Sequence, residues 1–197
     1  MVLKFMNTSS MKITIIAPHG FLVAALLSAL CGCAPHVTSV PAVPFQPTAT
    51  IRDIMQSIID PNIDAVWNSV ATVSTKAGTV EKSPHTDEEW NEVRQHALVV
   101  VEASNLLIMD GRQVAEPGQS TSTHAVELNP VQIQKGIDSH HADFVRHALQ
   151  LHDASVAALS AIKEKNTEKL VEAGGKIDQA CETCHAQFWY PNDKLPR

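Results

Sequence analysis

Residues 166–188 read NTEKLVEAGGKIDQACETCHAQF, and this stretch contains the pattern that decides the fold. Apolar or small residues recur along it at steps of three and four, at Leu170, Gly174, Ile177, Cys181, Cys184 and Phe188. This spacing is that of one face of an α-helix. Asn166 and Thr167 form a short polar link before the stripe and Pro191 follows it, so the sequence predicts a helix over residues 167–188.

The same periodicity predicts helices in the first half of the chain. An apolar stripe predicts a helix over residues 51–59, which Asp60 and Pro61 interrupt. We expect Asp60 to cap a new helical segment that continues to about residue 70. Thr86, followed three residues later by Glu89, is a capping-box pattern and predicts the start of a helix that reaches about residue 109.

A third long helix is predicted from Pro130 to about residue 165, on a nearly continuous apolar stripe. Residues 71–86 and 112–129 contain glycine, proline and hydroxyl residues without strand alternation, so loops are expected there. Long amphipathic helices with a short final connection predict an all-α fold, an antiparallel four-helix bundle, as one domain over residues 50–197.

Cys181-Glu182-Thr183-Cys184-His185, on the last predicted helix, is a CxxCH motif. Positions i, i+3 and i+4 share a helix face, so one turn offers two thiols and an imidazole to the same flat partner. This is the pattern of c-type haem attachment. We therefore expect one covalently attached haem c, bound through Cys181 and Cys184, with His185 as a ligand to the iron.

A redox dithiol, half of a zinc site and a structural disulfide are the alternatives for this motif. A thioredoxin-like dithiol needs a strand–helix setting, and a zinc ribbon needs a second pair of ligands; neither is found in this sequence. The chain has four cysteines, and the other two are Cys31 and Cys33 near the N-terminus. Its body therefore has no spare pair for a disulfide framework.

Gly174 and Gly175 lie inside the last predicted helix, where each glycine costs about 1 kcal/mol relative to alanine. Two explanations stay open. Either a small face lets another helix or the haem approach closely, or the helix frays at this point.

Residues 1–32 have the organisation of an export signal, with two lysines before an apolar run that is too short to span a bilayer. The run ends in Leu30-Cys31-Gly32-Cys33, which resembles a bacterial lipobox. We expect Cys33 to be lipidated and to anchor the protein to a membrane on the periplasmic side. An ordinary cleaved signal peptide and a start at Met11 are the alternatives.

Residues 33–49 contain four prolines and no charged residue, which favours an extended tether between the membrane and the domain. The chain has a net charge of −6, with 15 Lys and Arg against 21 Asp and Glu. Without a basic block, no nucleic-acid partner is expected. No acid–base or nucleophile constellation stands out near the CxxCH motif, so we do not expect an enzyme.

An acidic, exported, helical chain with a CxxCH motif near its C-terminus resembles the class II c-type cytochromes, the cytochrome c′ group. The likeness covers about residues 50–190, and its specific part is the CxxCH. It implies one haem c, His185 as the proximal ligand and a distal face built from the first helix. Low-spin members place a methionine of that helix on the iron, and Arg52-Asp53-Ile54-Met55 resembles their pattern of a basic residue followed three positions later by Met. Met55 is thus the implied second axial ligand, a thioether that raises the reduction potential.

Other roles stay open for several of these residues. Met55 is alternatively a core residue, since it lies on an apolar stripe. Arg52 lies near a haem propionate or is a solvated charge. Five histidines are alternative ligands, and each is otherwise a surface or half-buried helix residue: His96, His140, His141, His147 and His152.

The chain departs from the family in two places. Five-coordinate members often have an arginine just after the CxxCH region, whereas this chain has Phe188-Trp189-Tyr190. These aromatic residues cover the haem edge or cap the bundle, and they put gas chemistry on the proximal side in doubt. The long predicted loop over residues 112–129 has no assigned role.

The resemblance implies a monohaem electron carrier of the periplasm whose partners are redox proteins. The alternative is a haem protein that binds NO or CO at an open or displaceable sixth position. A subunit whose haem mainly stabilises a docking bundle is a third class. Class II bundles are often dimers, so the resemblance leaves a homodimer open.

Overall fold

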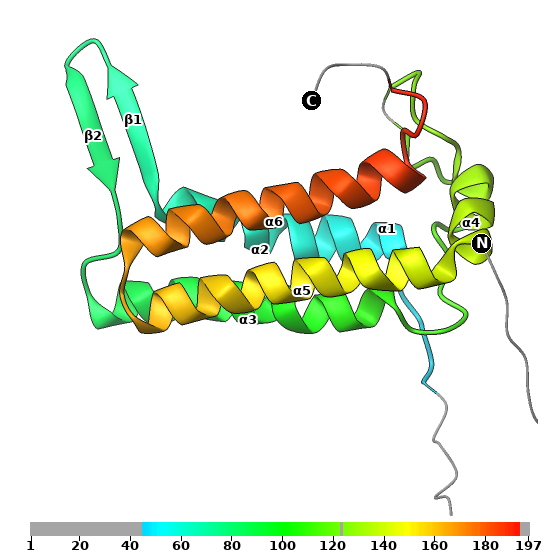
Figure 1. Ribbon diagram of the computed structural model, residues 1–197, viewed down its shortest axis with the longest axis horizontal. Coiled ribbons are helices and arrows are strands. Elements are labelled where there is room, and N and C mark those ends of the chain that lie inside the picture. The colour runs from blue at the N-terminus through cyan, green and yellow to red at the C-terminus, as the bar shows by residue number, and fades with distance from the viewer. Residues whose placement is uncertain (1–44, 123, 194–197) are drawn as a thin grey trace, which may run out of the picture. The chain divides into compact units, whose positions relative to one another are not determined.

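Long helices lie side by side in the computed structural model and bury one continuous apolar core (Figure 1). The structure describes residues 45–122 and 124–193. The helices are α1 (Ile51–Ile54), the π-helical turn η1 (Met55–Ile59), α2 (Asp60–Ser69), α3 (Asp87–Leu107), α4 (Pro130–Ser139), α5 (His141–Lys163) and α6 (Thr167–Phe188). Two strands, β1 (Ala71–Thr75) and β2 (Gly78–Lys82), lie between α2 and α3. The prediction of an all-α fold is confirmed in part, because the described residues are mostly helical and the small two-stranded sheet departs from it.

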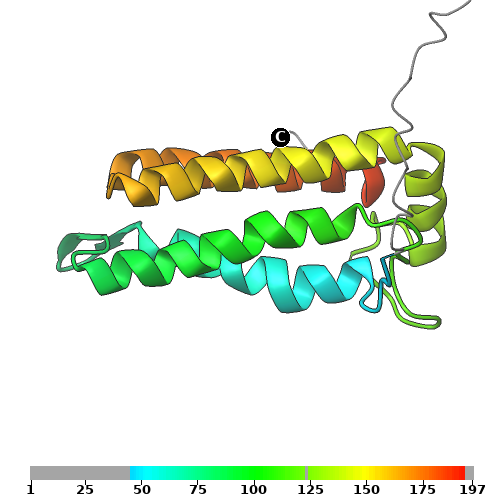
Figure 2. The same ribbon diagram turned by 90° about the horizontal axis from the view of Figure 1, so that it is seen from below.

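Helix α5 packs along both α6 and α3, and α3 packs along α2. Figure 2 shows α5 and α6 in one layer, with α3 and the α1–η1–α2 helix in the other. The turn between α5 and α6 is short because Lys165 adopts a left-handed conformation with φ 51°. Its N–H donates to the Ile162 carbonyl, and that of Asn166 donates to the Ala161 carbonyl, both at 3.0 Å. These bonds satisfy the last carbonyls of α5.

Two of the predicted helices are confirmed closely. Helix α6 covers the predicted residues 167–188, and the Asn166 side chain caps it by accepting from the Lys169 N–H. Helix α3 begins directly after Thr86, and the reciprocal Thr86–Glu89 capping box is present. A cap of this kind satisfies N–H groups that have no partner inside the helix.

The prediction that Asp60 caps a new segment is wrong, because helical backbone runs without a break from α1 through η1 into α2. The Asp60 N–H donates to the Met55 carbonyl, a π-helical bond that spans one residue more than an α-helical bond. Pro61 has no N–H and its ring clashes with a carbonyl one turn earlier in a regular α-helix. The wider π turn lies directly before Pro61, so the helix accommodates the proline there without ending.

The prediction of a loop over residues 71–86 is also wrong, because β1 and β2 pair as an antiparallel hairpin. Ala71 pairs with Lys82, and Thr75 pairs with Gly78 at the turn. Nearly every residue of both strands is exposed, so neither face has the buried apolar set that produces strand alternation. Figure 1 shows the hairpin projecting to one side of the helices, away from their packed core.

The predicted helix over residues 130–165 is two helices, α4 and α5, that meet at His140. His140 is non-helical, with φ −131° and ψ 42°, and it caps the end of α4 through its own N–H. Helix α4 turns across the ends of the long helices (Figure 1) and buries Ile133 and Ile137 there. Closing the end of the apolar core provides the physical reason for the break.

Part of the segment over residues 112–129 forms hydrogen bonds with the start of α1. The Gln113 and Val114 carbonyls accept from the Ile51 and Arg52 N–H groups at 2.9 and 3.0 Å. The guanidinium of Arg112, which is 8% exposed, donates to the carbonyls of Ala49 and Leu106. This segment therefore supplies partners for backbone groups at the ends of α1 and α3.

The predicted signal peptide, residues 1–32, and most of the predicted tether over residues 33–49 lie outside the described residues. Within residues 45–122 and 124–193, none of the helices combines the length and apolarity that crossing a membrane requires.

Candidate cofactor site

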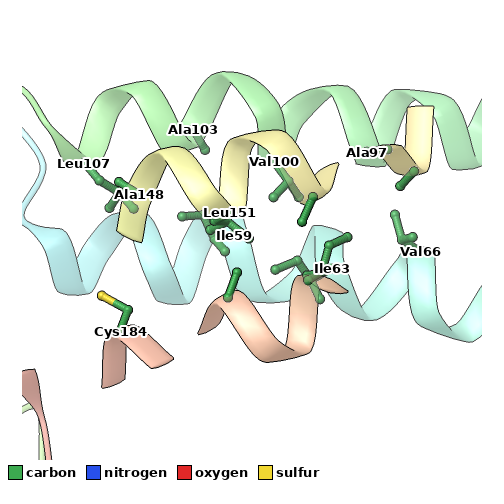
Figure 3. Packing of buried hydrophobic residues seen from close by; sticks show 14 of the residues in the cluster. Ile59, Ile63, Val66, Ala97, Val100, Ala103, Leu107, Ala148, Leu151 and Cys184 are labelled. Atoms are coloured by element: carbon green, nitrogen blue, oxygen red, sulfur yellow. The ribbon is translucent and has the colours of Figure 1, made fainter. Parts of the chain in front are cut away.

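A cavity of about 400 Å³ lies inside the helical core and is reached by every residue predicted for the site: Met55, Cys181, Cys184 and His185. Its walls are largely apolar, and they are formed by the α1–η1–α2 helix, α3, α5 and α6. The other lining residues are Ile59, Asp60, Ile63, Asp64, Trp67, Leu107, Phe144, His147, Ala148, Leu151, Ala180 and Trp189. Figure 3 shows Cys184 on α6 near the packed side chains of Ile59, Ala148 and Leu151.

Helical spacing explains why the CxxCH residues meet at this cavity. Cys184 is 9% exposed on the inner stripe of α6, and Cys181 is half-buried one turn earlier. Glu182 and Thr183 between them face solvent. One helix turn thus directs both sulfurs inward and keeps the two polar residues outside.

Burial raises the pKa of both thiols, Cys181 and Cys184, to about 12. A redox-active dithiol requires the opposite shift, because the thiolate is the nucleophile. Among the described residues, no group of three or more His, Cys, Asp or Glu side chains is arranged to hold a metal ion. The environment therefore favours protonated thiols, which disfavours the redox dithiol.

Desolvation in the cavity wall lowers the pKa of His185, so the imidazole is neutral near pH 7. A neutral imidazole is the form that binds a metal ion. In the part of the chain that the structure describes, no hydrogen bond engages either ring nitrogen of His185. The centroid of its ring lies 5.4 Å from the ring centroid of Trp189 and 6.3 Å from that of Tyr190. These two aromatic residues therefore cover the imidazole.

Among the carboxyl groups, Asp60 has the largest electrostatic effect on the pKa of Cys181 and of His185. Burial at the cavity wall raises its pKa, the nearby His185 opposes that shift, and the neighbouring Asp64 adds to it. Sequence reasoning did not identify either aspartate as a site residue. The signal that was available is their spacing, since residues 55, 59, 60, 63, 64 and 67 all line the cavity from one helix.

Met55 reaches the cavity from the helix opposite α6. It is half-buried at the first position of η1, where it also packs against the apolar core. Both readings of Met55, as an iron ligand and as a core residue, are therefore compatible with its position. Met109 lies elsewhere, with its sulfur 3.1 Å from an Arg112 nitrogen.

His147 is the member of the alternative histidine set that lines this cavity, and it is 5% exposed. Its Nε2 lies 2.7 Å from Oε1 of Gln187, whose amide nitrogen is directed at Asp143. Its Nδ1 lies 3.0 Å from the side-chain amide of Gln150. Both ring nitrogens are thus already engaged, Nε2 in a polar link between α5 and α6 and Nδ1 within α5.

The remaining histidines do not line the cavity. His96 Nδ1 contacts the Asn62 amide, His140 Nδ1 contacts the Gly136 carbonyl and His152 Nδ1 contacts Asp153. His141 is exposed at the start of α5. Their positions disfavour them as ligands at this site.

Trp67 forms the wall of the cavity where α2 meets α6. Its indole N–H donates to the Gly174 carbonyl at 3.2 Å. A Cβ on Gly174 would lie 3.2 Å from the Trp67 ring, so glycine permits this approach. Of the two explanations for the glycine pair, the close approach applies to Gly174, whereas Gly175 faces open space.

Arg52 does not line the cavity. Its Nη1 donates to Gln119 at 3.1 Å, and its buried Nε has no partner among the described residues. The arginine thus connects α1 to the segment over residues 112–129.

Comparisons with models of protein families, with curated proteins and with solved structures found no match to this chain.

The donor set and the cavity suit a haem c. Two protonated thiols sit one helix turn apart, a neutral imidazole follows them, and a thioether lies on the opposite helix. The cavity volume is in the range of sites that bind cofactors and small molecules, and apolar walls with a few polar groups are typical of them. Cys181 and Cys184 would hold the group covalently, and His185 and Met55 are the candidate ligands to its iron.

Proposed function

We propose that this protein is a monohaem c-type cytochrome of the class II group that carries electrons in the periplasm. Its architecture in this proposal is the antiparallel four-helix bundle of that group, formed by α3, α5, α6 and the α1–η1–α2 helix. One observation carries the proposal: the CxxCH residues of α6 and Met55 of η1 line the same apolar cavity from opposite sides.

Haem c, when bound, supplies a one-electron iron couple. The protein residues have separate tasks around it. Cys181 and Cys184 fix the group covalently, and His185 offers a neutral nitrogen that its aromatic neighbours shield. The cavity wall includes apolar side chains that disfavour water, those of Ile59, Ile63, Leu107 and Leu151. A low-dielectric site of this kind disfavours added charge and so influences the potential.

Met55 determines which class of haem protein this is. Met55 would hold the iron together with His185, and the protein would then serve electron transfer. If Met55 only packs, the apolar cavity favours small neutral gases, and NO or CO binding becomes the function. In either case we expect export through residues 1–32 and attachment to a membrane through Cys33.

The test is the optical spectrum of protein matured in a periplasm, ferric and ferrous, with and without CO. We expect a low-spin spectrum with a methionine–iron charge-transfer band and no response to CO. Met55→Ala should abolish that band and create a CO response, whereas Met109→Ala, away from the cavity, should leave the spectrum unchanged. A wild-type protein that is high-spin and binds CO would establish gas binding instead, and a protein without haem would refute both.

A further inference from the structure

A second, shallower hollow of about 330 Å³ lies on the outer surface between α2 and α6, next to the cofactor cavity. Val66, Trp67, Val70, Leu170, Val171, Gly174, Gly175 and Asp178 line it. Trp67 lines both this hollow and the cavity. A molecule seated in the hollow is therefore separated from the cavity by the width of one side chain.

The centre of this surface is apolar although it faces solvent. Val171 is 57% exposed and Trp67 is 36% exposed. Gly174 and Gly175 add no side chains between them, which leaves the hollow open. An exposed aromatic ring beside aliphatic groups has the character of the central part of a protein interface.

Carboxylates surround this apolar centre. Asp60 and Asp64 of α2 lie on the cavity side and Asp178 of α6 lies in the hollow. None of these three forms an ion pair with another described residue. The surface formed by Asp60, Asp64, Trp67, Val171, Gly174 and Asp178 is here called the α2–α6 face.

Among the residues that the structure describes, no lysine or arginine lines this surface. Helix α2 contains neither lysine nor arginine. The two lysines of α6 are Lys169 and Lys176, and they pair with Glu164 and Glu172. Neither lysine lines the hollow or the cavity. The α2–α6 face thus combines an apolar centre with a rim of unpaired negative charge.

We propose that the α2–α6 face docks a redox protein whose own contact surface has a small apolar centre and a lysine-rich rim. The inference rests on the proposed electron-carrier function and adds the site of exchange and the type of partner. Complementary charge steers two proteins together and fixes their orientation, and weak encounters of redox proteins use small interfaces. Trp67 places such a partner next to the cavity.

The experiment measures electron transfer from the ferrous, haem-loaded protein to a lysine-rich mitochondrial cytochrome c by stopped flow, across a range of ionic strength. Asp64→Lys with Asp178→Lys reverses the rim. Glu92→Lys with Glu102→Lys makes the same change of net charge at two exposed positions of α3. We expect the rim variant to react about tenfold more slowly than the α3 variant at low salt, and the rates to converge at high salt.

A second measurement follows the same docking by NMR. Adding the oxidised probe should shift the indole N–H signal of Trp67 and leave that of buried Trp90 unchanged. Equal slowing in both charge variants, or shifts that cluster away from α2 and α6, would overturn the docking face. The haem spectrum of each sample separates the two hypotheses, because haem-loaded variants with equal rates refute only the face. A protein lacking haem refutes the electron carrier and the face together.

Discussion

The adjacent glycines of α6 provide a matched pair of alanine substitutions for which different effects on stability are predicted. Gly174 and Gly175 occupy consecutive positions in the interior of the same helix, so replacing either with alanine brings the same gain in helix propensity, about 1 kcal/mol. The surroundings differ. A Cβ at position 175 meets nothing within 4 Å, whereas one at position 174 meets Trp67 Cδ1 at 3.2 Å and Nε1 at 3.3 Å.

The contact at position 174 offsets the gain in propensity. The Trp67 ring must move by a few tenths of an ångström, and this movement strains its 3.2 Å hydrogen bond to the Gly174 carbonyl. A hydrogen bond of this kind contributes about 1 kcal/mol net. Gly175→Ala is therefore expected to raise the free energy of unfolding by about 1 kcal/mol, and Gly174→Ala to leave it nearly unchanged.

Urea unfolding and thermal unfolding of the two variants beside the wild type provide the assay. A difference of about 1 kcal/mol corresponds to a difference in Tm of about 2–4 °C for a chain of this size. Trp67 fluorescence should change in the Gly174 variant and stay as in the wild type in the Gly175 variant. If both alanines stabilise the protein equally, the indole does not pack against Gly174 as described and the reasoning fails.

Two further predictions concern the cavity residues. In chain produced without haem, iodoacetamide should modify Cys181 and Cys184 about a thousandfold more slowly at pH 8 than in the urea-unfolded chain, since burial raises each thiol pKa from 9.0 to about 12. The same shift favours the folded state below about pH 9, and this stability is lost as the pH rises towards 12; rapid modification of the folded chain at pH 8 would contradict it. Gln187→Leu should lower the free energy of unfolding by about 1–3 kcal/mol, because it leaves buried His147 without its 2.7 Å partner. Gln150→Leu, at an exposed position where water can replace the amide, should cost less than about 0.5 kcal/mol, and equal costs would count against a polar link between α5 and α6.

Local chemistry made some elements predictable from the sequence. Thr86 and Glu89 are three residues apart in a capping box, and Asn166 and Pro191 bracket the stripe of α6, so both helices were located from short-range interactions. The CxxCH motif and Met55 were identified as site residues from their types and spacing. The structure brings all four to one cavity, while the attachment of haem stays a prediction.

Other features depend on contacts between distant segments, which a local pattern does not record. The end of α4 at His140 reflects burial of Ile133 and Ile137 over the ends of other helices. The hairpin was missed because exposed threonines and valines leave no alternation in burial. Trp67 and Asp60 became site residues only when α2 was found opposite α6, at a separation in sequence of more than a hundred residues.

The π turn at Met55–Ile59 has a consequence for how this helix tolerates changes in length. The buried residues of the helix are Ile51, Ile54, Ile59, Ile63 and Val66, and the step of five between Ile54 and Ile59 does not fit an α-helix. Removing one residue from this turn would shorten that step to four, which is the spacing of one face of a regular α-helix. The buried residues on both sides of the turn would then still face the core, and the cost would fall on Pro61, whose ring would meet the carbonyl one turn earlier. A single codon deletion within α2, by contrast, would rotate one side of the helix by about 100° relative to the other and turn part of the inward face away from the cavity.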